Sequence, residues 1–210
     1  MGLDYSFNFI ARRDRVDALF TALADRLTDD HAGRLREVLP WAPQYPHTAA
    51  PGICGFPPDR GHSNYYGVIV RFPLDPEIQR FVAENYRDHE SVVNGKAEIG
   101  MIYMQFYAGR EFLLLLLWAA TSDMSRMFAA SPQVRATMLA LAHDAQAHAL
   151  FFDPELGDRW ELLYPQAREA PQPEECPEEL EVPEQVDIYC KRLLDSAELY
   201  PPGSPHDSTQ

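Results

Sequence analysis

The feature that most constrains the fold of this chain is an uninterrupted apolar run of nine residues, "FLLLLLWAA", at 112–120. A helix needs about 20 residues to span a membrane, so this run is too short for one. It is long enough for a strand of about 30 Å, and consecutive leucines without polar alternation predict a strand that is covered on both faces. If the helices of the chain cover one face of the sheet, another part must cover the opposite face at this strand. The candidates are the loop at 40–64, the C-terminal segment and a second subunit.

The N-terminal third of the chain contains two predicted strands and one predicted helix. The stretch "LDYSFNFI" at 3–10 alternates apolar and polar residues, as a half-buried strand does. Apolar residues at helical spacing follow at 12–27, where Asp14 is the expected N-cap. Six prolines and three glycines at 40–64 exclude a regular element, and the β-branched and aromatic residues at 65–72 predict the second strand.

Helix start signals mark two more helices further along the chain. Asp75 is the expected N-cap of the first, with Pro76 at its first helical position. Ser131 and Pro132 form the same pair at the start of the second. The stretch "ALFF" at 149–152 then predicts a short final strand.

Two apolar runs, at 98–107 and 111–120, form a predicted hairpin, in which Gly109 is expected to supply the positive φ of a tight turn. The hairpin requires antiparallel pairing, and the helices are few enough to cover one face. The sequence therefore predicts an α+β fold: an antiparallel sheet of four to five strands with helices mainly on one face, a ferredoxin-like sandwich.

Composition divides the chain at residue 164. Residues 1–164 form one predicted α+β domain that carries the long Pro/Gly-rich loop at 40–64. Residues 165–210 form a predicted acidic, Pro/Glu-rich tail, which consists of a linker, one helix at 185–200 and a frayed terminus.

The charge of the chain restricts its partners. The formal net charge is −14, and residues 166–210 contribute −8 of it, from eleven Asp/Glu and three Lys/Arg. A phosphate backbone would repel such a chain, which disfavours nucleic-acid binding. The charge suits a basic protein partner, or it serves only to keep the chain soluble. Three unpaired cysteines and no secretory leader favour a cytoplasmic location, and no segment predicts membrane insertion.

Established catalytic signatures are missing from the sequence. It contains no P-loop, no dinucleotide-binding glycine motif and no kinase motif, so no cofactor is predicted. His143 and His148 lie five positions apart, whereas helical metal ligands are usually four apart, so no metal site is predicted either.

Four residues are weak catalytic candidates. Cys54 lies between glycines in the loop at 40–64, with His62 nearby as a base for a thiolate nucleophile. Ser122 and Asp123 follow the apolar strand, where an α/β-hydrolase places its nucleophile, but the glycines of the nucleophile elbow are missing. We therefore interpret Ser122 as the N-cap region of a helix, with Asp123 adding favourable charge to its first turn.

A candidate binding surface lies on the polar face of the first strand. With two residues of a strand expected beside it, this surface comprises Asp4, Ser6, Asn8, Tyr65 and Arg71. The alternative is an ordinary solvated sheet face, which antiparallel sheets often have.

The segments "MGLDYSFNFIARRD" and "WAATSDMSRMFAASPQVR" resemble a group of bacterial proteins that begin with an L-D-Y-x-F strand and carry an A-A-T-S-D-M-S stretch. The resemblance covers residues 1–30 and 100–155. It implies a bacterial, cytoplasmic globular domain. No activity is established for this group, so the resemblance assigns no role to any residue.

These observations favour a non-enzymatic binding protein, of the immunity or inhibitor type, that acts on a basic protein partner. One alternative is a small enzyme with a pocket between the loop at 40–64 and the sheet. Another is a structural homodimer, formed through sheet faces or the C-terminal helix. The enzyme would draw its polar groups from His47, Cys54, His62, Ser122 and Asp123.

Overall fold

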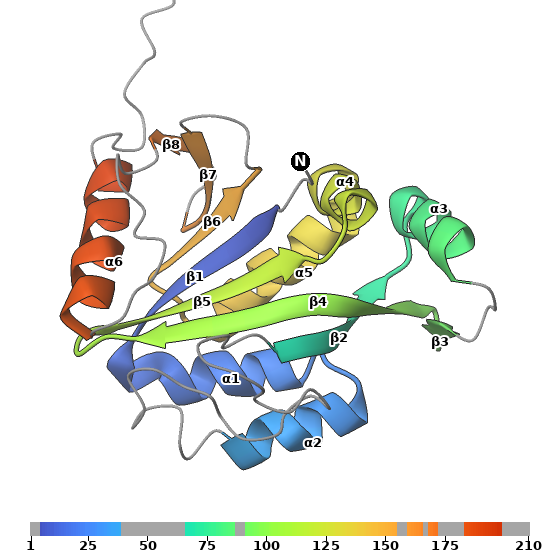
Figure 1. Cartoon of the computed structure of the whole chain (residues 1–210), viewed down its shortest axis with the longest axis horizontal. Helices are drawn as coiled ribbons and strands as arrows, with labels where there is room; N and C mark the ends of the chain where they lie inside the picture. The colour runs from blue at the N-terminus through green and yellow to red at the C-terminus, as the bar shows by residue number, and fades with distance from the viewer. Residues whose placement is uncertain are drawn as a thin grey trace, which may run out of the picture.

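The structure is a computed structural model of the 210-residue chain, and it describes residues 5–38, 66–86, 91–154, 159–165, 168–171 and 183–198. Eight antiparallel strands form one sheet in this part of the chain, in the order β2-β4-β5-β1-β6-β7-β8, with the short β3 paired to β4 (Figure 1). The strands are β1 (Ser6–Arg12), β2 (Tyr66–Pro73), β3 (Val92–Val93), β4 (Lys96–Ala108), β5 (Phe112–Ala119), β6 (Ala149–Asp153), β7 (Arg159–Tyr164) and β8 (Arg168–Pro171).

Six α-helices and one 3-10 helix accompany the sheet in the described ranges. The α+β class with an antiparallel sheet is therefore confirmed, and the sheet is larger than the four to five strands that the sequence predicts. The helices are η1 (Arg13–Arg15), α1 (Val16–Ala24), α2 (Asp29–Val38), α3 (Pro76–Asn85), α4 (Ser122–Ala130), α5 (Pro132–Asp144) and α6 (Pro183–Glu198).

The leucine run forms β5, which lies between β4 and β1 in the sheet. Leu113, Leu115 and Leu117 point into the main core with the residues of α1 to α5. Phe112 and Leu114 point to the opposite face, into a second core. The prediction of a central strand covered on both faces is confirmed.

The C-terminal helix is the element that forms this second core. α6 stands apart from the other helices in Figure 1 and packs on the sheet face that they leave open. Burial of this apolar surface is the main source of its docking energy. The second core consists of Ile10, Phe112, Leu114, Ala149, Phe151, Trp160 and Leu162 from the sheet, and Val186, Tyr189, Cys190, Leu193 and Ala197 from α6.

A buried carboxylate fixes α6 to the β4–β5 hairpin. Asp187 accepts hydrogen bonds from the backbone N–H groups of Arg110 at 2.8 Å, Glu111 at 3.0 Å and Phe112 at 3.0 Å. Gly109 makes room for it, because a Cβ there would lie 2.1 Å from Asp187 Oδ1. The predicted positive φ of Gly109 is wrong, and this close approach explains the glycine instead.

Two ion pairs flank that contact. Arg110 pairs with Glu184, and Lys191 Nζ lies 2.7 Å from Glu111 Oε1. All four side chains are about half exposed or more, so each pair contributes little stability. The buried Asp187 carboxylate and the apolar second core are therefore the main links between α6 and the sheet.

A second buried carboxylate joins two helices. Asp75 caps α3 as predicted, with its Oδ1 accepting from Ile78 N at 2.8 Å. Its Oδ2 accepts from Ser131 Oγ at 2.5 Å and from Gln133 N at 3.0 Å. Ser131 caps α5 as predicted, by accepting from Val134 N at 3.0 Å. One carboxylate thus serves the N-termini of both α3 and α5.

The predicted N-cap at Asp14 is wrong. Asp14 lies inside η1, a 3-10 turn that carries the chain from β1 into α1, and the N-cap position of α1 is Arg15 without a side-chain cap bond. No helix in the described part of the chain combines the length and apolar character needed to cross a membrane.

Candidate functional site

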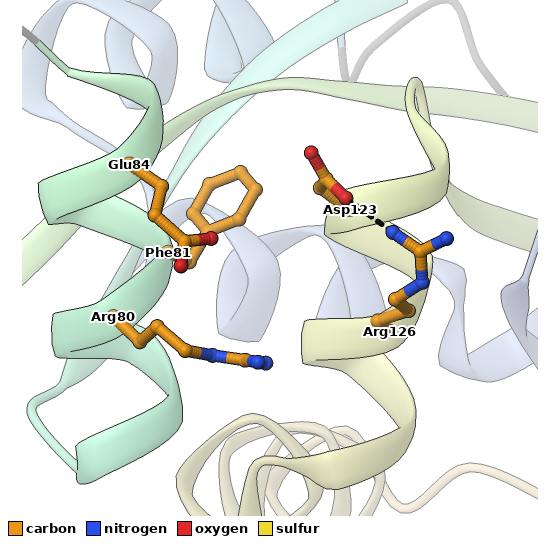
Figure 2. A pocket seen from close by; sticks show the side chains of 5 residues that line it. All are labelled: Arg80, Phe81, Glu84, Asp123 and Arg126. Carbon is orange, nitrogen blue, oxygen red and sulfur yellow. Dashed lines mark hydrogen bonds and ion pairs between the residues drawn. The ribbon is translucent and has the colours of Figure 1, made fainter.

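A small pocket lies between α3 and α4 at the surface of the molecule (Figure 2). Its volume is about 110 Å³, below the several hundred Å³ that enclose most small-molecule ligands. Phe81 forms its apolar floor and belongs to the main core. The other lining residues are Arg80, Glu84, Asp123 and Arg126.

The pocket contains charges of both signs, and most of them are already paired. Arg126 pairs with Asp123 one turn earlier on α4, at 2.5 Å. Arg80 pairs with Glu77 one turn earlier on α3, at 2.6 Å. Glu84 is exposed, and in the described ranges it has no ion-pair partner. The pocket therefore offers one unpaired carboxylate above an apolar floor.

Among the described residues, Asp123 is the only predicted catalytic candidate that lines this pocket. It lies in the first turn of α4, together with Ser122, where the sequence predicts a helix start. The cap itself is Thr121, one residue before the predicted Ser122, and its Oγ1 accepts from Met124 N at 3.2 Å. The interpretation of this stretch as a helix start is confirmed, but the residue predicted to cap it is wrong.

Thr121 and Ser122 should therefore differ in how much they contribute to the stability of the fold. We expect Thr121→Ala to lower the free energy of unfolding by about 1 kcal/mol, because it removes the cap of α4. We expect a smaller loss for Ser122→Ala, since Ser122 is not the cap. Urea unfolding of both variants measures this, and an equal or larger loss for Ser122→Ala would contradict the assignment.

The predicted polar surface of β1 is buried rather than solvated. Ser6 is 5% exposed and Asn8 is 1% exposed, and Asn8 Nδ2 donates to Ser6 Oγ at 2.9 Å. Arg71 is not beside them, because β4 and β5 separate β2 from β1. It pairs instead with Glu98 at 3.0 Å and Asp29 at 2.9 Å. The three residues do not form one surface, and ligand binding by Ser6 and Asn8 stays a prediction.

β5 and β4 continue the sheet face that carries Ser6 and Asn8. Asn8 lies opposite Leu116, and Leu116 lies opposite Gln105 on β4. Ser6 lies opposite Trp118, and Trp118 lies opposite Tyr103. The sequence analysis did not predict that Tyr103 and Gln105 lie on the same sheet face as Ser6 and Asn8. Gln105 could have been noticed, because it is the one amide side chain in an apolar strand.

The remaining predicted site residues lie outside the described residues. They are Asp4 and Tyr65 of the binding surface and His47, Cys54 and His62 of the enzyme alternative. A pocket between the loop at 40–64 and the sheet therefore stays a prediction.

The third cysteine does not offer a nucleophile. Cys190 is buried in the second core, and burial, followed by the charge of Asp187, raises the pKa of its thiol far above the ordinary value. A thiol with a raised pKa is unreactive near neutral pH. Among the described residues, no three or more His, Cys, Asp and Glu side chains are grouped so as to hold a metal ion.

Comparison with known proteins adds no further information. No protein-family model, curated protein or solved structure matches this chain. The function must therefore be argued from the charges and surfaces of the molecule itself.

Proposed function

We propose that this chain is a non-enzymatic binding protein, of the immunity or inhibitor type, that neutralises a basic protein partner. One observation supports this most strongly. Three exposed aspartates on η1, α1 and α2 have no ion-pair partner among the described residues, and we call them the acidic edge: Asp14, Asp17 and Asp30.

The elements that carry the acidic edge have a small surplus of negative charge. Residues 13–38 contain six Asp/Glu and five arginines. One of these arginines, Arg26, is bound to Asp144 of α5 at 2.6 Å and does not neutralise the edge. α1 packs against α2, and the two helices lie on the same side of the sheet (Figure 1). Their aspartates thus add to the field that the net charge of −14 creates.

These positions also have a structural benefit. Asp14, Asp17 and Asp30 lie in the first turns of their helices, where the helix dipole favours negative charge. The interaction with the helix dipole does not pair these carboxylates with a cation, and they stay exposed to solvent. Exposed charge of one sign accelerates association with a partner of the opposite sign through electrostatic steering.

The proposal is tested by affinity capture from a native lysate that includes the products of adjacent genes. We expect the immobilised chain to retain a basic protein at about 20 mM salt and to lose most of it at about 0.5 M, because salt screens exposed charges. The triple variant Asp14→Asn, Asp17→Asn, Asp30→Asn should retain several-fold less of the same protein.

A matched control removes the same amount of charge elsewhere. The triple variant Glu111→Gln, Asp144→Asn, Glu184→Gln neutralises carboxylates that are already in ion pairs. It should retain more of the partner than the variant of the acidic edge. Recovery of no basic protein, or equal loss in both variants, would contradict the proposal.

We also infer that the four central strands are related to the ferredoxin-like sandwich. Their order is β4-β5-β1-β6, with a hairpin between β4 and β5 and helices after β1 and β5. A β-α-β-β-α-β unit has this succession of elements. β2 and α3 then form an insertion before β4, and β2 extends the sheet at its edge.

A further inference from the structure

The pocket between α3 and α4 has a charge pattern that selects the sign of its ligand. Five ionisable side chains lie in or beside it: Glu77, Arg80, Glu84, Asp123 and Arg126. Two acidic residues neutralise the two arginines in ion pairs along their own helices. The charge left over is that of Glu84, so the pocket attracts a cation.

The position of Glu84 on its helix strengthens this preference. Glu84 lies in the last turn of α3, which ends at Asn85 and contains no basic residue in that turn. The carbonyl groups at a helix C-terminus carry partial negative charge and favour a cation nearby. A carboxylate in the same turn is unfavourable until a cation neutralises it. A bound cation would therefore interact with both Glu84 and the end of α3.

The walls and floor of the pocket limit the shape of that cation. Figure 2 shows the carboxylate of Glu84 on the α3 side and Asp123 on the α4 side, with the Phe81 ring between the two helices. A volume of about 110 Å³ suits a single side chain better than a drug-sized ligand. A cationic side chain has a methylene stem that can lie on an apolar floor while its charged end meets carboxylates.

We infer that the α3–α4 pocket is the docking point for one arginine side chain of the basic protein partner. The guanidinium group pairs with Glu84 and shares the carboxylate of Asp123 with Arg126, and its stem lies on Phe81. Arginine fits better than lysine because its planar group has five donors and can bond two carboxylates at once. This inference rests on the proposed function. The arginine contact fixes how the partner is oriented on the chain, whereas the acidic edge attracts the partner at longer range.

The test is an NMR titration of the full chain with the capped tripeptide Gly-Arg-Gly, and with its citrulline counterpart, which has the same shape without the charge. We expect the arginine peptide to shift the signals of Phe81, Glu84 and Asp123 and to saturate in the millimolar range, as a single contact should. The citrulline peptide should produce no saturating shift. Glu84→Gln should weaken arginine binding at least tenfold, and the control Asp195→Asn, at an exposed carboxylate of α6, should leave it unchanged.

Three outcomes would overturn the inference. They are equal binding of the citrulline peptide, unchanged binding to Glu84→Gln, and no saturating shift at Phe81 and Glu84. Shifts confined to Asp14, Asp17 and Asp30 would contradict the pocket and leave the proposed function standing. Failure of the proposed function itself is read separately, from the salt-dependent capture of a basic protein.

Discussion

We expect Gly109→Ala to lower the free energy of unfolding by about 3 kcal/mol. The added Cβ would lie 2.1 Å from Oδ1 and 2.7 Å from Cγ of Asp187, and 3.0 Å from the carbonyl oxygen of Phe112. Moving Asp187 away would leave three backbone N–H groups of the hairpin without their acceptor. α6 should then detach, which trypsin would detect as faster cleavage after Lys191 and Arg192, both exposed on α6.

Two controls separate this clash from a general cost of replacing glycine. Gly33→Ala makes the same change in α2, where a Cβ would meet nothing within 4 Å. It should stabilise the chain by about 0.5–1 kcal/mol, because alanine is the better helix former. In the background of Asp187→Ala, Gly109→Ala should cost less than about 1 kcal/mol, since its main obstacle is gone. Additive losses would contradict the assigned contact.

The second large effect concerns the carboxylate that α3 and α5 share. We expect Asp75→Ala to lower the free energy of unfolding by about 3 kcal/mol, because it removes a cap and leaves buried donors unsatisfied. Those donors are Ile78 N, Gln133 N and Ser131 Oγ. Asp195→Ala, at an exposed carboxylate on α6, is the matched control and should change stability by less than about 0.5 kcal/mol. Urea unfolding at neutral pH measures both.

The carboxylate of Asp75 also makes the stability of the fold depend on pH. Burial alone would raise the pKa of Asp75, but hydrogen bonds from Ser131, Ile78, Gln133 and Glu77 outweigh burial and hold it below the ordinary value. A lowered pKa in the folded chain means that the ionised form stabilises folding above the ordinary pKa of about 3.9. This contribution should disappear as pH falls through the lower, folded-state value. Asp75→Asn should therefore lose less stability than wild type between pH 5 and pH 2, and parallel acid-unfolding curves would contradict this.

The central part of the fold could be predicted because the sequence signals were local and strong. The apolar run at 112–120 had no polar alternation, which requires two covered faces, and β5 has them. Asp75 and Ser131 stood directly before prolines, and both cap helices. The helix predicted at 185–200 overlaps α6, but its place on the sheet depends on Asp187 meeting a hairpin that lies 75 residues or more away in sequence. No local pattern contains that contact.

Several elements were missed although their residues carried signals. Asn94 and Gly95, both with positive φ, form the turn between β3 and β4, and Asn-Gly is a strong hairpin signal. Ala32 and Leu35 are the buried face of α2. Trp160 and Leu162 alternate with polar residues in β7, as in a strand. β8 was not predicted, because the composition of its segment resembles a linker. The sequence analysis therefore assigned it to the acidic tail.

The candidate site was less predictable than the fold. Asp123 was singled out for its place after a strand, but three of the other four lining residues of the pocket come from α3. Arg80, Phe81 and Glu84 have the spacing of an ordinary amphipathic helix, and only the packing of α3 against α4 turns them into a pocket. The separation of Arg71 from Ser6 and Asn8 likewise depends on strand order, which the sequence does not specify.

The most direct test of the proposed function is the rate of association with the captured basic partner, measured by stopped flow over a range of salt concentrations. If the acidic edge steers that partner, the rate constant for the wild-type chain should fall about tenfold or more between 20 mM and 300 mM salt. The triple variant of Asp14, Asp17 and Asp30 should associate more slowly at low salt and depend less on salt. A rate constant that is independent of salt, or equal for the two chains, would contradict the account.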